Sequence, residues 1–329
     1  MFTNYFPITR VERCLHCSVP VSAVSEPTRE GYADRKFILY LVFVVRWLRK
    51  YLLTVSSCAC LIGLMAVTAA YGASPSPNTT QSSREFDSSF EDVAEFSGFY
   101  IVPNGQYESR HELSTERVHD GKYAHKAWIT AARAADNDGW TYRPHRAYPT
   151  IQFQKTPGGV YRTPCLVSLW VWLDMTLQKK PRGQTNDWFS FLTLSPDTSD
   201  NWTRTVVVDL APEGYALLVH VPRQGLQNHI YQASALNDPD EKLKVPQKRW
   251  VRLDVYIDFA SRDGYAKVWQ DGMLISHGLV EGGTGSLAQA HFGLYAAASI
   301  ASGVVYNDNL RVREVANEDE AQKLVSSPL

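Results

Sequence analysis

Residues 250–275 read WVRLDVYIDFASRDGYAKVWQDGMLI, and their pattern decides the fold. From Val251 to Phe259 every second residue is apolar, and the residues between them are mostly polar. Successive side chains of a strand point to opposite faces, so this alternation predicts a strand with one face on a hydrophobic core. Asp271-Gly272 then separates two further strand-like runs. This dipeptide is typical of a hairpin, because both central residues of a type I′ turn need a positive φ.

Similar strand-like runs recur along the chain between turn residues, and no long stretch with helical periodicity competes with them. They lie at residues 125–131, 146–154, 167–174, 188–195, 204–210, 215–222, 291–297 and 303–315. About ten short strands with turn residues between them are typical of two packed antiparallel sheets. We therefore expect an all-β domain that forms a two-sheet antiparallel sandwich or jelly roll.

The N-terminal part of the chain has the pattern of an export signal rather than of a folded domain. A basic run at 46–50 precedes an apolar run at 51–70, and small residues follow before a polar stretch. This order predicts either a secretory signal cleaved near Gly72 or Ala73, or an uncleaved membrane anchor. We expect an N-terminal extension with this segment at 1–73, a linker at 74–85, the jelly-roll domain at 86–315 and a polar tail at 316–329. The tail is expected to be a short helix or disordered.

Composition limits the partners of the exported protein. The chain has 33 basic and 34 acidic side chains and lacks a basic run within the domain, so it is not expected to bind nucleic acid. Membrane contact is expected only through the N-terminal segment, the protein is expected to be a monomer, and cleavage would leave Cys165 without a disulfide partner. The 9 Trp and 17 Tyr residues either pack within the sheets or stack on sugars.

Strand alternation places chemically active side chains on faces that point away from the core. The side chains assigned to these outer faces are Arg146, Tyr148, Gln152, Trp170, Trp172, His291 and Tyr295. On one concave sheet they would form a groove for an acidic sugar, since Arg binds carboxylates and Trp stacks on pyranose faces. They could equally be ordinary cross-strand partners. In residues 215–222 the apolar face leaves His220 on the other side, where it is either hydrogen-bonded structurally or part of the groove.

Several of these segments resemble concanavalin A-like jelly rolls, in particular the polysaccharide lyases of the heparin-lyase and alginate-lyase kind and glycan-binding laminin-G-like domains. The resemblance rests on the opening segment 85–100, on RAYPTIQF at 146–153, on 250–275, and on the closing pair HFGLY at 291–295 and VVYNDNLRV at 304–312. It implies a concave sheet that holds a polysaccharide.

In such lyases a Tyr acts as acid and base while neighbouring residues neutralise a uronate carboxylate during β-elimination. The resemblance therefore implies catalytic roles for Tyr295, His291 and Arg146, and substrate contacts for Tyr148, Gln152, Trp170, Trp172 and His220. A hydrolase, a non-catalytic carbohydrate-binding module and a structural or protein-interaction sandwich remain alternatives.

Asp308 interrupts an apolar face that it is expected to share with Val304, Tyr306, Leu310 and Val312. A buried carboxylate needs a partner. Related jelly rolls often hold a structural Ca²⁺ between their first and last strands, which implies a metal site with Glu91 and Asp308 as ligands. The alternative is that Asp308 accepts backbone N–H bonds at a turn or pairs with an Arg.

Overall fold

The computed structural model describes residues 84–327 except for 134–142, 199–201, 233–241 and 261. The predicted signal or anchor segment therefore lies outside the described residues, as does almost all of the predicted linker. Among the described residues, no helix has both the length and the apolar character that a membrane crossing requires.

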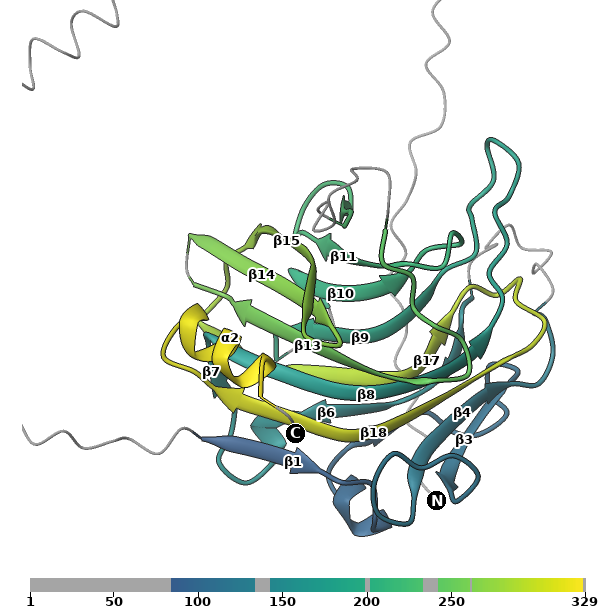
Figure 1. The fold of residues 1–329 in the computed structure, drawn as a ribbon, viewed down its shortest axis with the longest axis horizontal. Coiled ribbons are helices and arrows are strands. Elements are labelled where there is room, and N and C mark those ends of the chain that lie inside the picture. Colours follow the sequence, from purple (N-terminus) through teal and green to yellow (C-terminus); the bar gives the residue numbers. More distant parts are fainter. Residues whose placement is uncertain (1–83, 134–142, 199–201, 233–241, 261, 328–329) are drawn as a thin grey trace, which may run out of the picture. The chain divides into compact units, whose positions relative to one another are not determined.

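Two antiparallel sheets of eight strands each form the described part of the chain (Figure 1). In sheet A the strand order is β15-β14-β13-β8-β18-β4-β3, and β1 also pairs with β18. Its strands are β1 (Glu85–Ser88), β3 (Ser109–Ser114), β4 (Ala124–Ile129), β8 (Cys165–Met175), β13 (Trp250–Asp258), β14 (Asp263–Gln270), β15 (Met273–Glu281) and β18 (Gly303–Glu314).

Sheet B has the order β12-β11-β10-β9-β17-β6-β2, and β5 also pairs with β17. Its strands are β2 (Tyr100–Ile101), β5 (His145–Ala147), β6 (Pro149–Gln152), β9 (Phe189–Ser195), β10 (Thr205–Leu210), β11 (Ala216–Val221), β12 (Asn228–Ile230) and β17 (Gln289–Ala296). A small third sheet pairs β7 (Tyr161–Arg162) with β16 (Ser286–Leu287), and two short 3-10 helices span Val93–Phe96 and Phe153–Lys155.

The hydrophobic core lies between the two large sheets. On β8, Val167, Leu169 and Val171 are buried in it, as the alternation predicts. On the side of sheet B, the core includes Phe292 and Leu294 of β17. The expectation of an all-β sandwich is confirmed, because each sheet turns one face of alternating apolar side chains toward the other.

The predicted hairpin at Asp271-Gly272 joins β14 to β15. Asp271 has φ 49° and Gly272 has φ 81°, which are the positive values that a type I′ turn requires. The three strands of the 250–275 segment are consecutive neighbours at one edge of sheet A.

The C-terminal segment contains helix α2 (Glu318–Val325), which packs on the outer face of sheet A (Figure 1). Ala321 and Val325 are buried against an apolar cluster that includes Tyr256 and Trp269. Arg252 forms an ion pair with Asp254 and also donates hydrogen bonds to carbonyl groups at the end of the helix. Of the two alternatives for the tail, the structure has the helix, and it is part of the packed unit.

Candidate functional site

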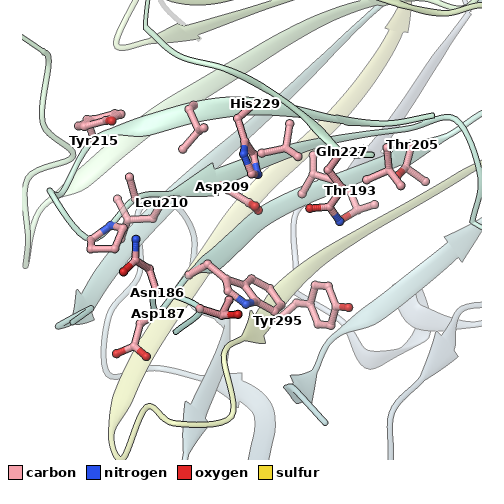
Figure 2. Close-up of a pocket in the computed structure, with 18 of the residues that line it drawn as sticks. Asn186, Asp187, Thr193, Thr205, Asp209, Leu210, Tyr215, Gln227, His229 and Tyr295 are labelled. Atoms are coloured by element: carbon pink, nitrogen blue, oxygen red, sulfur yellow. The ribbon is translucent and has the colours of Figure 1, made fainter. Parts of the chain in front are cut away.

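A cavity of about 640 Å³ lies on the outer face of sheet B, the face that does not pack on sheet A (Figure 2). Side chains from β5, β9, β10, β11, β12 and β17 line it, together with residues 185–188 and 211–215 of two connections. A cavity thus lies on the outward face of one sheet, and it is lined by side chains from at least six strands.

Directly opposite residues on neighbouring strands form two rows across the cavity. The first row runs Arg146, Tyr295, Ser190, Asp209 and Leu217. The second row runs Thr150, His291, Thr193, Val207 and Val219. Because neighbouring strands lie about 4.8 Å apart, residues next to each other in a row are within contact distance of a shared ligand.

Extra residues in two strands bend the sheet between these rows. The rows are four residues apart on β17, between His291 and Tyr295, but only two apart on β10, between Val207 and Asp209. Register shifts at β17 with β9 and at β9 with β10 account for the difference. Such bulges bend a strand and change the direction of its side chains. The bends make the outer face of sheet B concave where the two rows cross it.

Gly293 is the residue that makes the bend in β17 possible. It has φ 101°, a conformation that side chains rarely adopt, and a Cβ placed there would lie 2.9 Å from the carbonyl oxygen of Ala147 and 3.0 Å from His125. A glycine inside a strand marks either a bulge or the close approach of a ligand or another backbone. The neighbours of the missing Cβ are protein atoms, so the bulge explains this glycine.

Arg146 and Tyr295 meet at one end of the first row. The guanidinium carbon of Arg146 lies 5.7 Å from the Tyr295 ring centroid and 5.4 Å from that of Tyr107. Burial raises the pKa of Tyr295, although the charge of Arg146 and its hydrogen bond to the hydroxyl oppose the rise. Tyr295 is therefore protonated at neutral pH, beside a guanidinium that is always charged.

His291 is enclosed by aromatic rings. Its ring stacks on Tyr148 at a centroid distance of 4.4 Å and lies 4.9 Å from Trp202 and 5.7 Å from Tyr295. Burial, followed by the charge of Arg146, lowers the pKa of His291 to about 3, so the imidazole is neutral. Within the described residues neither ring nitrogen has a hydrogen-bond partner, and His291 lines the cavity. Arg146, Tyr148, His291 and Tyr295, which the sequence placed on outer faces, thus come together.

Asp209 on β10 is a cavity residue that the sequence analysis missed (Figure 2). Asp209 as a whole is half-buried, but its Oδ1 atom is shielded from solvent and has no hydrogen-bond partner among the described residues. Burial raises the pKa of Asp209 to about 7, against the effect of a hydrogen bond from Ser190. The sequence did contain a signal for it. Val206, Val208 and Leu210 face the core, so strand alternation places Asp209 on the outer face.

The half of the cavity beyond Asp209 has an apolar floor, with polar side chains such as Gln227 and His229 beside it (Figure 2). Tyr215, Leu217 and Val219 are buried together on its floor, where Val207 and Val221 pack against them. The sequence placed the apolar face of this segment toward the core, but the core-facing residues are Ala216 and Leu218. At the boundary of the two halves, the Trp188 ring meets the edge of Tyr295 at a centroid distance of 4.9 Å.

Trp170 and Trp172 do not share this cavity. Both lie on β8 of sheet A and point away from the core, where Trp170 stacks on His119 at 3.8 Å and Trp172 meets Tyr306 edge-on. The expectation that they belong to the same groove as Arg146 is wrong. Each of the two sheets has an outer face, and alternation cannot say which sheet a strand joins.

His220 and Gln152 lie outside the cavity lining as well. His220 faces the edge of the sandwich, where its Nδ1 contacts the carbonyl oxygen of Thr205 at 3.1 Å and its Nε2 accepts the Glu281 N–H at 2.9 Å. Of the two alternatives for His220, the structure therefore has the structural, hydrogen-bonded histidine. Gln152 shares the outward face of β6 but contacts Gln289 and Lys155 instead of the cavity.

Asp308 is fully buried, although on a different face from the one expected. A register shift between Asp308 and Arg311, with Asn309 at φ 47°, moves Leu310 to the core side while Asp308 pairs with Trp170 on the outer side. Its Oδ2 accepts the N–H groups of His119 at 2.8 Å and Asp120 at 3.3 Å. Burial raises the pKa of Asp308 to about 6, with the Glu91 charge adding to the rise.

The predicted calcium ligands thus lie near each other but are engaged by amides. Glu91 accepts backbone N–H groups from Lys122 and Tyr123, as Asp308 does from the preceding residues of the same loop. Among the described residues, no three His, Cys, Asp or Glu side chains gather as metal ligands would. These contacts are those of hydrogen-bonded carboxylates, so the calcium ion stays a prediction and has no part in the chemistry below.

Comparisons with known proteins match this fold at low sequence identity. No protein-family model and no curated protein matches the sequence. Among solved structures, a glucuronan lyase from the fungus Trichoderma reesei is similar with 13% identity and a TM-score of 0.43, over 66% of this chain and 90% of that one. The cellulose-induced protein Cip1 is similar with 15% identity and a TM-score of 0.46, over 70% of this chain and 97% of that one.

A third similar structure is the alginate lyase Aly36B, with 12% identity and a TM-score of 0.41, over 73% of this chain and 95% of that one. The fold itself is established by this chain's own two antiparallel sheets and the core between them. The protein is an all-β sandwich that resembles concanavalin A-like jelly rolls, with a cavity on the outer face of sheet B.

Proposed function

We propose that the cavity on sheet B binds a glycan that contains uronic acid. The observation that carries the proposal is the convergence of Arg146, His291 and Tyr295 in one cavity. A half-buried guanidinium beside hydroxyl and imidazole groups is suited to a carboxylate on a polar ring, since it can form two parallel hydrogen bonds with it. Arg146 has a free Nε–H for such a bond among the described residues.

Aromatic rings around this cluster support a sugar as the ligand. Tyr148, Trp188 and Trp202 all line the cavity within ring-contact distance of His291 or Tyr295. Sugars combine flat apolar faces with hydroxyl groups, so they favour surfaces that offer ring faces next to hydrogen-bonding groups.

We further propose that the cluster cleaves the bound chain by β-elimination. Arg146 would neutralise the uronate carboxylate, which makes the neighbouring C5 proton removable. His291 would accept that proton, the C5–H electron pair would form the C4–C5 double bond, and the C4–O4 bond would break. Tyr295 would donate its proton to the departing O4. The raised pKa of Tyr295 keeps its proton available for donation, and the ring nitrogens of His291 have no hydrogen-bond partner among the described residues.

Binding without cleavage is the second candidate, and the surroundings of His291 favour it. An imidazole with a pKa of about 3 is a weak base, and its ring is held between Tyr148 and Trp202. In this alternative His291 would only form a hydrogen bond with a sugar hydroxyl, either as donor or as acceptor.

Product formation separates the two candidates. Elimination creates an unsaturated uronate that absorbs ultraviolet light, so the protein is incubated with polyglucuronate, alginate, pectin and hyaluronan. Cleavage predicts rising absorbance, and Tyr295→Phe should lower the rate about 100-fold or more, as for loss of a general acid. Tyr265→Phe, on sheet A, is the matched control and should retain the rate. Retention of a glycan without product would support the binding candidate.

We also propose that the protein is exported, because polymers of this kind are extracellular and the segment 46–73 has the pattern of a signal. Sequencing the N-terminus of the protein recovered from the medium or cell envelope tests this. Cleavage near Gly72 or Ala73 is expected for a signal, while retention of the segment in the membrane fraction is expected for an anchor. A full-length protein found only inside the cell would contradict both.

A further inference from the structure

The two ends of the cavity differ in charge. Of the described lining residues, Arg146 is the one with a permanent positive charge, and it lies at one end of the first row. Asp209 lies three strand spacings away on the same row, beside Leu217. At about 4.8 Å per strand, the two positions are separated by roughly 14 Å along the row.

No lysine or arginine among the described residues lines the Asp209 end, so this end has no counterpart to the guanidinium that would hold the first carboxylate. The floor there is made of Leu217, Val219 and Val221, on which a carboxylate would lose its hydration. The neighbouring lining residues Gln227 and His229 offer hydrogen-bonding groups. Asp209 itself is ionised above its pKa of about 7 and would repel such a group.

The positive charges nearest to this end are engaged by other groups. Lys179 pairs with Glu213 at 3.2 Å, at the rim of the cavity. Lys180 pairs with the lining residue Asp187 at 3.3 Å, and Lys242 lies 4.5 Å from the ring centroid of Tyr215 and contacts its hydroxyl at 3.3 Å. The Asp209 end therefore presents an apolar floor, the hydrogen-bonding groups of Gln227 and His229, and the carboxyl group of Asp209. This combination suits a neutral sugar whose hydroxyl donates to Asp209.

We propose that the cavity selects a mixed glycan, in which a uronate held at Arg146 is followed, about three units along the chain, by a neutral sugar held at Asp209. The proposal rests on the function proposed above. A chain that crosses the strands advances by about one strand spacing per sugar, so the two contacts fall on different units of one chain. A strictly alternating polymer satisfies this arrangement, since its fourth unit is neutral when its first is a uronate.

Two binding probes test the selection directly. Polyglucuronate is a uronate at every unit, whereas hyaluronan alternates glucuronate with neutral N-acetylglucosamine. At about pH 8, where Asp209 is ionised, we expect oligosaccharides of equal length from hyaluronan to bind about tenfold more tightly than those from polyglucuronate. Asp209→Asn should reduce this preference to about twofold or less, while Asp263→Asn, at an exposed position on sheet A, should preserve it.

The outcomes distinguish the two proposals. If the unmodified protein binds no uronate-containing glycan, the proposed function fails and this selection fails with it. If both probes bind equally to the unmodified protein, or if Asp209→Asn leaves the preference intact, the selection alone is overturned. The comparison of the two probes on the unmodified protein does not depend on the folding of any variant.

Discussion

Burial controls the chemistry of the individual residues in the cavity. It keeps Tyr295 protonated and His291 neutral, and it holds the pKa of Asp209 at about 7, while Arg146 keeps its charge. The sequence could place Arg146, His291 and Tyr295 on outward faces, because alternation depends only on local geometry. It missed Asp209, since one carboxylate in the short run RTVVVDL looks like an ordinary solvent-facing residue until the neighbouring strands enclose it.

The raised pKa of Asp209 predicts a pH-dependent loss of stability. A carboxyl whose pKa is higher in the folded than in the unfolded state does not change the free energy of unfolding below about pH 4, where it is protonated in both states. Between about pH 4 and pH 7 it lowers that free energy increasingly, and above about pH 7 the loss is complete. Asp209→Asn removes the ionisable group. We therefore expect the variant to gain on the order of 2 kcal/mol relative to the unmodified protein between about pH 4 and pH 8, allowing for water in the cavity.

Urea unfolding at a series of pH values measures this difference. Asp263→Asn removes an exposed carboxylate at the start of β14 and controls for the loss of a charge as such. A constant stability difference between Asp209→Asn and the unmodified protein across the pH range would show that Asp209 is not a carboxyl with a raised pKa.

Bulges are the feature of the strands that alternation could not predict. One extra residue reverses which later side chains face the core, so each strand downstream of a bulge is misassigned by a strict period of two. This is why Asp308 was expected on the face of Leu310 and Val312. In β17 the pattern survived the bulge, because His291 and Tyr295 both remain on the cavity side.

Gly293→Ala tests the role of the bulge in β17. A Cβ at this φ meets the Ala147 carbonyl oxygen at 2.9 Å, so we expect a loss of about 1–3 kcal/mol in the free energy of unfolding. We also expect weaker glycan binding, because Tyr295 follows the bulge by two residues. Gly105→Ala is the comparison, since this glycine also has a positive φ but has open space around its Cβ position. Equal losses in the two variants would mean that backbone conformation alone, and not the close contact, explains Gly293.

At the scale of the whole molecule, the sequence predicted the sandwich but not which strands share a sheet. Hydrophobic alternation and turn residues gave the strands and the type I′ hairpin, which are local properties. The pairing of β8 with β13 and β18, which takes Trp170 and Trp172 to the opposite sheet from Arg146, depends on contacts between segments far apart in the chain. The domain was also predicted to end at residue 315, before α2. In the structure this helix packs on Tyr256 and Trp269 of sheet A.

The predicted calcium ion would connect the first and last strands of the domain through Glu91 and Asp308, and thermal unfolding can test it. A bound ion would raise the melting temperature when calcium is added and lower it when a chelator is added. Asp308→Asn should abolish this response. A melting temperature of the unmodified protein that is the same in calcium and in chelator would contradict the prediction and leave the amide hydrogen bonds as the full account of both carboxylates.

The central claim is that the cavity of sheet B around Arg146, and not the aromatic outer face of sheet A, binds a uronate-containing glycan. Calorimetric titration with oligosaccharides of hyaluronan, polyglucuronate, alginate and pectin tests it most directly, using the unmodified protein, Arg146→Ala and Arg117→Ala. Arg117 lies 5.1 Å from the Trp172 ring centroid on sheet A and is the matched control. We predict that at least one acidic glycan binds, that Arg146→Ala weakens it about 10- to 100-fold, and that Arg117→Ala leaves it unchanged. Unchanged affinity in Arg146→Ala, or loss of affinity in Arg117→Ala alone, would contradict the claim.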